Sequence, residues 1–244
     1  MAAKKKAKPA SGSTAASAVC ERCGGYGYYL DEGNIARPCD CGMYEQVVRR
    51  GSRVRNSGIP VRFMDKELDT FQHQKGDRTR AQIVQAARAY ARSFRKDESE
   101  GLLLRGKPGS GKTHIAVGIL KEVLRRGFTG HYTNFNDLLS RLRDSYNRGS
   151  LESEAELLAE MEESDLLVLD DVGAESATNW VRDRLYLIVN RRYESARALL
   201  VTTNCGEEQL RAHVGERTAS RLYEMCSQDF PLFPDQDYRL ANLR

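Results

Sequence analysis

The sequence predicts an α/β fold, a parallel β-sheet flanked by helices, preceded by a small cysteine-rich module. Short apolar runs of strand length alternate with amphipathic helical patterns from about residue 76 onward, and this alternation is typical of a parallel sheet covered by helices. A glycine-rich loop follows the first of these strands, and four cysteines lie between residues 20 and 41. With 244 residues, the chain has room for one ordinary α/β domain and one small module.

Hydrophobic periodicity locates the elements of this fold. Strands are expected over residues 101–105, 131–135, 166–170 and 198–203. Helices are expected from about residue 77, and over 113–126, 136–146 and 180–193. The acidic segment 152–165 is expected to form a solvated amphipathic helix.

The charge of the chain is concentrated at its N-terminus. The net charge of +4 equals the lysines among the first eight residues, because the other 34 basic residues balance the 34 acidic ones. Binding of nucleic acid would therefore need a local basic patch. No apolar run approaches the roughly 18 residues that a membrane-spanning helix needs, and no apolar signal segment follows the lysines. We therefore expect a cytoplasmic protein with no membrane partner.

The loop at residues 106–113 reads Gly-Lys-Pro-Gly-Ser-Gly-Lys-Thr and matches the phosphate-binding loop over its full length. Its glycines allow backbone angles that let N–H groups close around phosphate oxygens. The Lys112 ammonium would contact the β and γ phosphates, and the Thr113 hydroxyl would hold Mg²⁺. The sequence therefore predicts an ATPase that binds ATP or ADP with Mg²⁺. The residues expected to bind the nucleotide are Gly106, Pro108, Gly109, Ser110, Gly111, Lys112, Thr113 and His114.

Polar side chains are expected to complete this site from two neighbouring strands. Asp170 and Asp171 end the buried strand 166–170, and ligands of open α/β sheets bind at the carboxyl ends of strands. Asp170 would join Thr113 in holding Mg²⁺. The end of this strand resembles that of AAA+ ATPases, in which the residue after the metal-binding aspartate polarises the attacking water. The resemblance implies that Asp171 is the catalytic base, and Glu175 is the alternative. Asn204 follows the strand 198–203 and would orient the attacking water, with an ordinary strand-ending turn as the alternative.

The four N-terminal cysteines have the spacing of metal ligands. They form a Cys-x2-Cys pair and a Cys-x-Cys pair separated by fifteen residues. Four thiolates suit one tetrahedral Zn²⁺, and a reducing compartment disfavours disulfides. The second pair has one intervening residue where zinc ribbons usually have two, so free or redox-active thiols are the alternative. The expected zinc ligands are Cys20, Cys23, Cys39 and Cys41.

Residues 60–244 resemble the bacterial helicase loader family of AAA+ ATPases, the DnaC and DnaI type, which is related to the IstB transposition helpers. The resemblance rests on the sequences at 170–175, 190–193, 202–204 and 215–222. It implies that Arg221, or alternatively Arg217, reaches into the ATP site of a neighbouring copy. The sequence Asp-Tyr-Arg at 237–239 resembles a C-terminal motif of the family, which implies that Arg239 lies near the nucleotide.

Composition and the resemblance together give the expected domain organisation. We expect an AAA+ P-loop NTPase without a C-terminal lid domain, since 23 residues follow Arg221. The expected segments are a disordered basic tail (1–18), a zinc-binding module (19–50), a linker (51–75) and the AAA+ ATPase domain (76–244).

The implied protein is a slow, stimulated ATPase that self-associates through its ATP site. It would bind a hexameric replicative DNA helicase and deliver it onto single-stranded DNA. An IstB-like ATPase that regulates a transposase is one alternative. A zinc-dependent nucleic-acid-binding module that uses ATP as a switch is the other.

Overall fold

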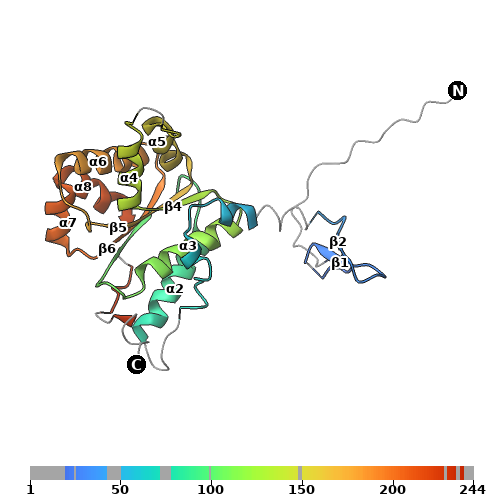
Figure 1. The fold of residues 1–244 in the computed structure, drawn as a ribbon. Coiled ribbons are helices and arrows are strands. Elements are labelled where there is room, and N and C mark those ends of the chain that lie inside the picture. The colour runs from blue at the N-terminus through green and yellow to red at the C-terminus, as the bar shows by residue number, and fades with distance from the viewer. Residues whose placement is uncertain are drawn as a thin grey trace. The chain divides into compact units, whose positions relative to one another are not determined.

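The computed structural model describes residues 20–24, 26–42, 51–71, 78–98, 100–147, 150–227, 230–234 and 237–238. The chain divides into two compact units, Met1–Arg49 and Arg50–Arg244 (Figure 1). The tail predicted over residues 1–18 lies outside the described residues.

The larger unit is built on a five-stranded parallel sheet in the order β4-β5-β6-β3-β7. Its strands are β3 (Gly101–Arg105), β4 (Gly130–Asn134), β5 (Leu166–Val172), β6 (Ala198–Thr203) and β7 (Cys226–Ser227). The order is not sequential, so the chain crosses over between strands, and helices form the crossovers. The predicted α/β fold with a parallel sheet is confirmed.

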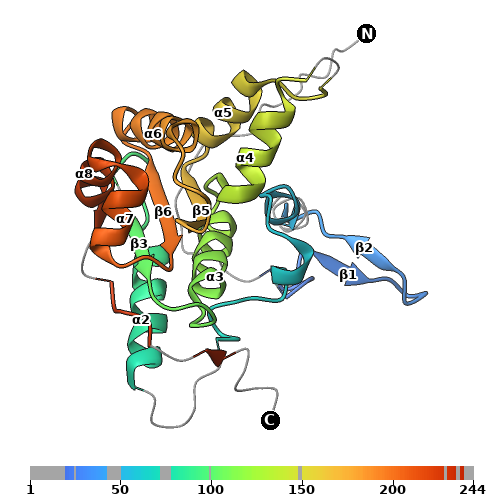
Figure 2. The same ribbon diagram turned by 60° about the vertical axis from the view of Figure 1, so that its left-hand side comes forward.

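Helices cover both faces of this sheet (Figure 2). They are α2 (Arg78–Ser93), α3 (Lys112–Arg125), α4 (Phe135–Asp144), α5 (Glu154–Glu163), α6 (Asn179–Glu194), α7 (Glu207–Val214) and α8 (Glu216–Met225), with a 3-10 turn η1 (Val61–Phe63) before them. None of the helices in the described part of the chain is long and apolar enough to cross a membrane.

Alternation along the buried strands produces two hydrophobic cores. In β5, Leu166 and Val168 pack with α2 and α3 on one face of the sheet, whereas Leu167 and Leu169 pack with α4 to α8 on the other. Successive side chains of a strand point to opposite faces. A strand that is buried on both faces must therefore be apolar at consecutive positions, as the run 166–169 is.

Side chains cap the first turns of several helices, among them α5 and α6. Ser153 and Glu156 form a capping box at the start of α5, in which each side chain bonds the other residue's backbone N–H. The Thr178 hydroxyl accepts a hydrogen bond from Val181 N at the start of α6. The acidic segment expected to be an amphipathic helix is therefore α5, whose apolar side packs into the second core.

The structure differs from the predicted linker over residues 51–71. Ile59, Leu68 and Phe71 are buried in the core beside α2 and α3. Glu67 pairs with Lys121 and Arg125 of α3, at 2.8 and 2.7 Å. The apolar residues of this segment follow neither the helical nor the strand period, so the sequence suggests an exposed linker. In the structure, these apolar side chains are nevertheless buried against the larger domain.

The smaller unit contains a short antiparallel hairpin, β1 (Tyr28–Leu30) and β2 (Ala36–Pro38). The carboxylate of Asp31 organises its turn by accepting hydrogen bonds from Gly33 N and Ile35 N, each at 3.0 Å. Arg37 Nε donates to the other carboxylate oxygen at 2.8 Å. This arginine, followed by the turn amides, lowers the pKa of Asp31.

Candidate active site and zinc centre

The glycine-rich loop joins β3 to the N-terminus of α3, as the sequence predicts. Gly109 and Gly111 have φ angles of 76° and 98°, in the left-handed region that favours glycine. Lys112 Nζ donates to the carbonyl oxygens of Gly106 and Lys107, at 2.8 and 2.9 Å, and to Asn204 Oδ1 at 2.7 Å. The ammonium group is therefore held by the loop and by the end of β6.

Asp170 lies at the centre of a hydroxyl cluster beside this loop. Its side chain is buried, and Thr113 Oγ1 donates to its two oxygens at 3.0 and 3.1 Å. Thr202 Oγ1 and Tyr132 OH also donate, at 2.6 and 2.7 Å. Burial raises the pKa of the Asp170 carboxyl, and the three hydroxyl donors oppose that shift. Carboxylate and hydroxyl oxygens suit Mg²⁺, so Asp170 and Thr113 together fit the predicted Mg²⁺ ligands.

Asn204 connects the loop lysine to the second carboxylate. Its Oδ1 accepts from Lys112, and its Nδ2 donates to Asp171 Oδ1 at 2.8 Å. Asp171 has a φ of 62°, which is rare for a residue other than glycine, and its backbone N–H donates to Thr202 Oγ1 at 2.9 Å. The ladder between β5 and β6 is irregular at this point. Non-glycine residues in this region are strained and cluster at functional sites.

Glu175 lies in a different set of contacts. It accepts hydrogen bonds from Gly173 N at 3.1 Å and from His213 Nε2 at 2.9 Å. Its side chain is 5% exposed, so these partners and not water surround it. The structure thus brings Asp171, and not Glu175, into hydrogen-bond contact with Asn204.

The two candidate arginines on α8 differ in their surroundings. The Arg221 guanidinium stacks on two tyrosines of α6, 5.0 Å from the Tyr186 ring centroid and 5.5 Å from that of Tyr193. Its buried Nε has no hydrogen-bond partner among the described residues. Arg217, one turn earlier, is exposed. The Arg221 guanidinium therefore packs against two aromatic rings, whereas the Arg217 side chain is exposed.

A C-terminal segment lies across the glycine-rich loop. Tyr238 N donates to the Gly109 carbonyl at 3.2 Å, and a Cβ atom at position 109 would collide with the Asp237 carboxylate. The Arg80 guanidinium stacks 3.2 Å above the Tyr238 ring centroid. These contacts place the predicted C-terminal motif beside the loop, although Arg239 itself lies outside the described residues.

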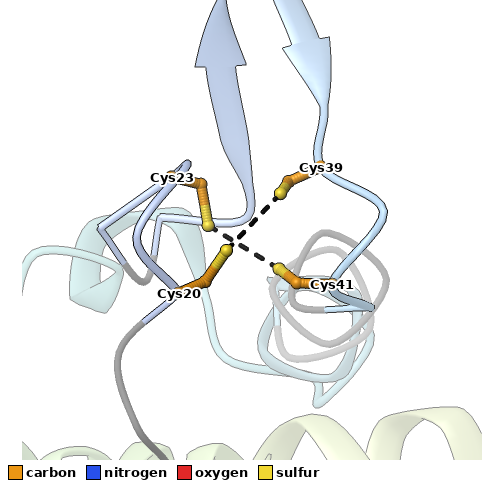
Figure 3. Close-up of side chains that lie close together, drawn as sticks. All are labelled: Cys20, Cys23, Cys39 and Cys41. Atoms are coloured by element: carbon orange, nitrogen blue, oxygen red, sulfur yellow. Dashed lines mark hydrogen bonds between the residues drawn. The ribbon is translucent and has the colours of Figure 1, made fainter.

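The four N-terminal cysteines converge on one point (Figure 3). Their sulfur atoms all lie within 4.8 Å of one another, with Cys20 Sγ 3.8 Å from Cys39 Sγ and Cys23 Sγ 3.7 Å from Cys41 Sγ. Four thiolates about 2.3 Å from a tetrahedral Zn²⁺ would lie about 3.8 Å apart. None of the four forms a disulfide. The arrangement fits a structural zinc site, and the Cys-x-Cys spacing does not prevent it.

Removal of one cysteine is expected to release the metal and to spare the nucleotide site. In Cys39→Ser, zinc content should fall from about one ion per chain to near zero, because a structural site needs all four ligands. ATP affinity should stay within about twofold, since the loop belongs to the other unit. Metal analysis and nucleotide titration measure both. Cys205→Ser is the matched control, and full zinc retention in Cys39→Ser would contradict the assignment.

Comparison with known proteins places this site in a family. The model of the IstB-like ATP binding proteins matches residues 43–221, which include the loop, Asp170, Asp171 and Asn204. The chain belongs to the IstB-like ATP-binding family. The replicative helicase loader DnaC of Escherichia coli K12 is 33% identical to this IstB-like protein over 136 residues. That alignment covers 56% of this chain and 55% of DnaC, so the chain spans about half the length of that relative.

Two further comparisons extend over more of the IstB-like protein. The uncharacterized protein YdaV of E. coli K12 is 33% identical over 185 residues, 73% of this chain and 72% of its own. A crystal structure of the DnaC helicase loader matches with a TM-score of 0.64 and 28% identity. It covers 72% of this chain and 100% of that chain. The AAA+ fold expected from the resemblance is thus shown.

Sequence reasoning missed several polar groups of the IstB-like site. Tyr132 and Thr202 hydrogen-bond to Asp170 from the two neighbouring strands, but each looks in the sequence like an ordinary strand residue. The His114 ring donates from Nε2 to the Glu67 carbonyl oxygen, 2.7 Å away, and packs edge-on against Phe71. Its imidazole is therefore held by the segment before α2, and the nucleotide contact of His114 stays a prediction.

Proposed function

We propose that this IstB-like protein hydrolyses ATP and loads a hexameric replicative DNA helicase onto single-stranded DNA. The observation that carries the proposal is the bridge by which Asn204 joins Lys112 to Asp171 beside the buried Asp170. This arrangement would supply a phosphate-binding cation, a metal ligand and a carboxylate base in one place. The similarity to a replicative helicase loader supports the choice of partner.

The loop would bind ATP by donating hydrogen bonds to its phosphates. The backbone N–H groups at the start of α3 and the Lys112 ammonium would bind the phosphates, and Lys112 would exchange its contacts with loop carbonyls for phosphate oxygens. Thr113 and Asp170 would hold Mg²⁺, which when bound neutralises charge on the phosphates. The hydrogen bonds that the Asp170 carboxylate accepts from three hydroxyl groups orient it for that role.

Hydrolysis would depend on the pair Asp171 and Asn204. The Asn204 amide would orient the attacking water, and the Asp171 carboxylate would accept its proton. We favour Asp171 over Glu175 as the base because Glu175 is buried against His213 and the Gly173 amide. The half-buried Asp171 carboxylate instead accepts a hydrogen bond from the Asn204 amide.

Replacing each carboxylate by the corresponding amide distinguishes the two candidate bases. In Asp171→Asn, the turnover number should fall by about 100-fold or more, since general-base groups contribute about 10² to 10⁴ in rate. In Glu175→Gln, turnover should fall by less than about fivefold, because the amide can still bond Gly173 and His213. Steady-state phosphate release measures both. The reverse ranking would assign the base to Glu175.

The oligomer would complete each ATP site in trans. Arg221 would reach the phosphates bound by a neighbouring copy, and Arg217 is the alternative. Turnover of the separate chain is then slow, and assembly on the helicase or on single-stranded DNA stimulates it. Loss of ATP after hydrolysis would release the loader from the ring.

Regulation of a transposase is the second candidate, because the sequence also resembles the IstB transposition helpers and the matching family model is that of the IstB-like ATP binding proteins. The deciding experiment mixes the purified protein with the replicative helicase from the same source, with and without ATP. Size-exclusion chromatography with light scattering gives the mass of any complex. An ATP-dependent complex supports the loader. Absence of a complex in both conditions would reject the loader and favour the transposase partner.

A further inference from the structure

The helix that carries the two candidate arginines begins at a glycine with an open surrounding. Gly215 joins α7 directly to α8, and its φ of 85° lies in the left-handed region that favours glycine. A Cβ atom at this position would meet no described residue within 4 Å beyond its chain neighbours. The path of the chain from α7 into α8 is therefore not fixed by packing at residue 215 and depends on contacts on either side of it.

The end of α7 is held by two groups from outside the helix. Arg182 of α6 donates to the carbonyl oxygens of Ala212 and His213, at 2.7 and 3.0 Å. The His213 side chain is 15% exposed, and its Nε2 donates to Glu175 Oε1 at 2.9 Å. Both contacts lie just before Gly215, so they determine where α8 starts.

Glu175 belongs to the loop that follows β5 at the edge of the ATP site. This loop has other anchors, because Thr203 Oγ1 of β6 donates to the Val172 carbonyl oxygen at 2.6 Å. Within the loop, Gly173 N donates to Glu175 at 3.1 Å. The loop is thus held in place without His213. The hydrogen bond from His213 matters at its other end, where it ties the end of α7 to the loop.

Burial makes the hydrogen bond between His213 and Glu175 hard to break. The Glu175 side chain is 5% exposed, so water does not replace a partner that moves away. A buried carboxylate that loses a hydrogen-bond donor carries a large desolvation cost. The end of α7 therefore cannot shift from the loop without that cost.

The position of Arg221 follows from the position of α8. The helices α6, α7 and α8 pack together (Figure 2), and the Arg221 guanidinium stacks on Tyr186 and Tyr193 of α6. Hydrogen bonds along a helix make it move as one unit. A displacement at the start of α8 is therefore carried to Arg221, in the second turn of the helix.

We propose that His213 is a positioning residue, which through its hydrogen bond to Glu175 sets the place of the Arg221 guanidinium. The inference rests on the proposed function, in which this arginine completes the ATP site of a neighbouring copy. Such an arginine must meet the transferred phosphoryl group closely, and a misplacement of about 1 Å can cost about 100-fold in rate. His213 touches neither nucleotide nor the reacting atoms in this role.

The first test compares two substitutions of His213 in the full-length protein. His213→Leu removes the donor and keeps a side chain of similar size. Its turnover with helicase and single-stranded DNA should fall at least about 10-fold, as expected for a displaced catalytic group. His213→Gln is the matched control, because its amide nitrogen lies as many bonds from Cα as Nε2 does and can donate to Glu175. It should keep most of the wild-type rate, and the Kd for ATP should be unchanged in both variants.

Mixing with Lys112→Ala protein separates a role in trans from a role within the chain. Lys112→Ala chains are expected not to bind ATP, but they keep His213 and Arg221. If His213 acts through Arg221, an equimolar mixture with His213→Leu should turn over ATP faster than the average of its two components. Each His213→Leu site next to a Lys112→Ala chain then meets a correctly placed arginine. A mixture no faster than that average overturns the proposal and places the effect of His213 in its own ATP site.

The remaining outcomes are equally decisive. Unchanged stimulated turnover in a folded His213→Leu protein overturns the positioning role while the proposed function stands. An equal loss in His213→Gln overturns the role of the hydrogen bond. Wild-type turnover that responds to neither helicase nor single-stranded DNA overturns the proposed function and this inference together. Should His213→Leu fail to fold, Glu175→Leu/His213→Leu makes the same comparison, since it removes the buried carboxylate together with its donor.

Discussion

Lys112→Ala is expected to abolish nucleotide binding. The lysine ammonium sits between two loop carbonyls and Asn204, at 2.7 to 2.9 Å. Its removal takes away the cation that would meet the β and γ phosphates. Truncating one partner of a buried, hydrogen-bonded charge pair costs about 2–5 kcal/mol, so ATP affinity should fall at least about 30-fold. Titration with a fluorescent ATP analogue measures the Kd directly.

Lys107→Ala is the matched control for that experiment. Lys107 lies in the same loop and carries the same charge, but it is exposed. ATP affinity should change by less than about threefold, as expected for an exposed charge. Equal losses in both variants would mean that only the net charge of the loop matters. Unchanged affinity in Lys112→Ala would remove this lysine from the site.

The phosphate-binding loop could be predicted because its function depends on local sequence. Glycines at fixed spacing and the lysine that follows determine the loop backbone and the cation together. Asp170 was also predictable, since a carboxylate that ends a buried parallel strand lies at the edge of the sheet where ligands bind. In the structure, Thr113 donates to Asp170 across 57 positions of sequence, and the parallel sheet accounts for that proximity.

Other parts of the site depend on contacts that leave no local pattern. The segment before α2 looks like a linker, yet Lys121 of α3 reaches the Met64 and Lys66 carbonyls at 2.6 and 3.0 Å. The Tyr238 backbone meets Gly109, although 129 positions separate them. Such packing is set by the completed fold, so sequence periodicity cannot reveal it.

Arg221→Ala is expected to retain ATP binding and to lose stimulated turnover. The arginine lies on α8 against the rings of Tyr186 and Tyr193, so its truncation should leave the phosphate-binding loop unchanged. Arginine fingers contribute about 10³ to 10⁵ in rate. Turnover measured with helicase and single-stranded DNA should therefore fall by at least about 100-fold, while the Kd for ATP stays within about threefold. Arg217→Ala should keep most of its stimulated turnover.

A mixing experiment shows whether the arginine acts in trans. Lys112→Ala protein has an inactive site but an intact Arg221, whereas Arg221→Ala protein has an intact site without its arginine. If the arginine completes a neighbouring site, mixed assemblies contain pairs in which both groups are present. An equimolar mixture should then regain a measurable fraction of the wild-type rate, although each variant alone is inactive. A mixture as inactive as its components would place the role of Arg221 within its own chain, and loss of turnover in Arg217→Ala alone would transfer the role to that residue.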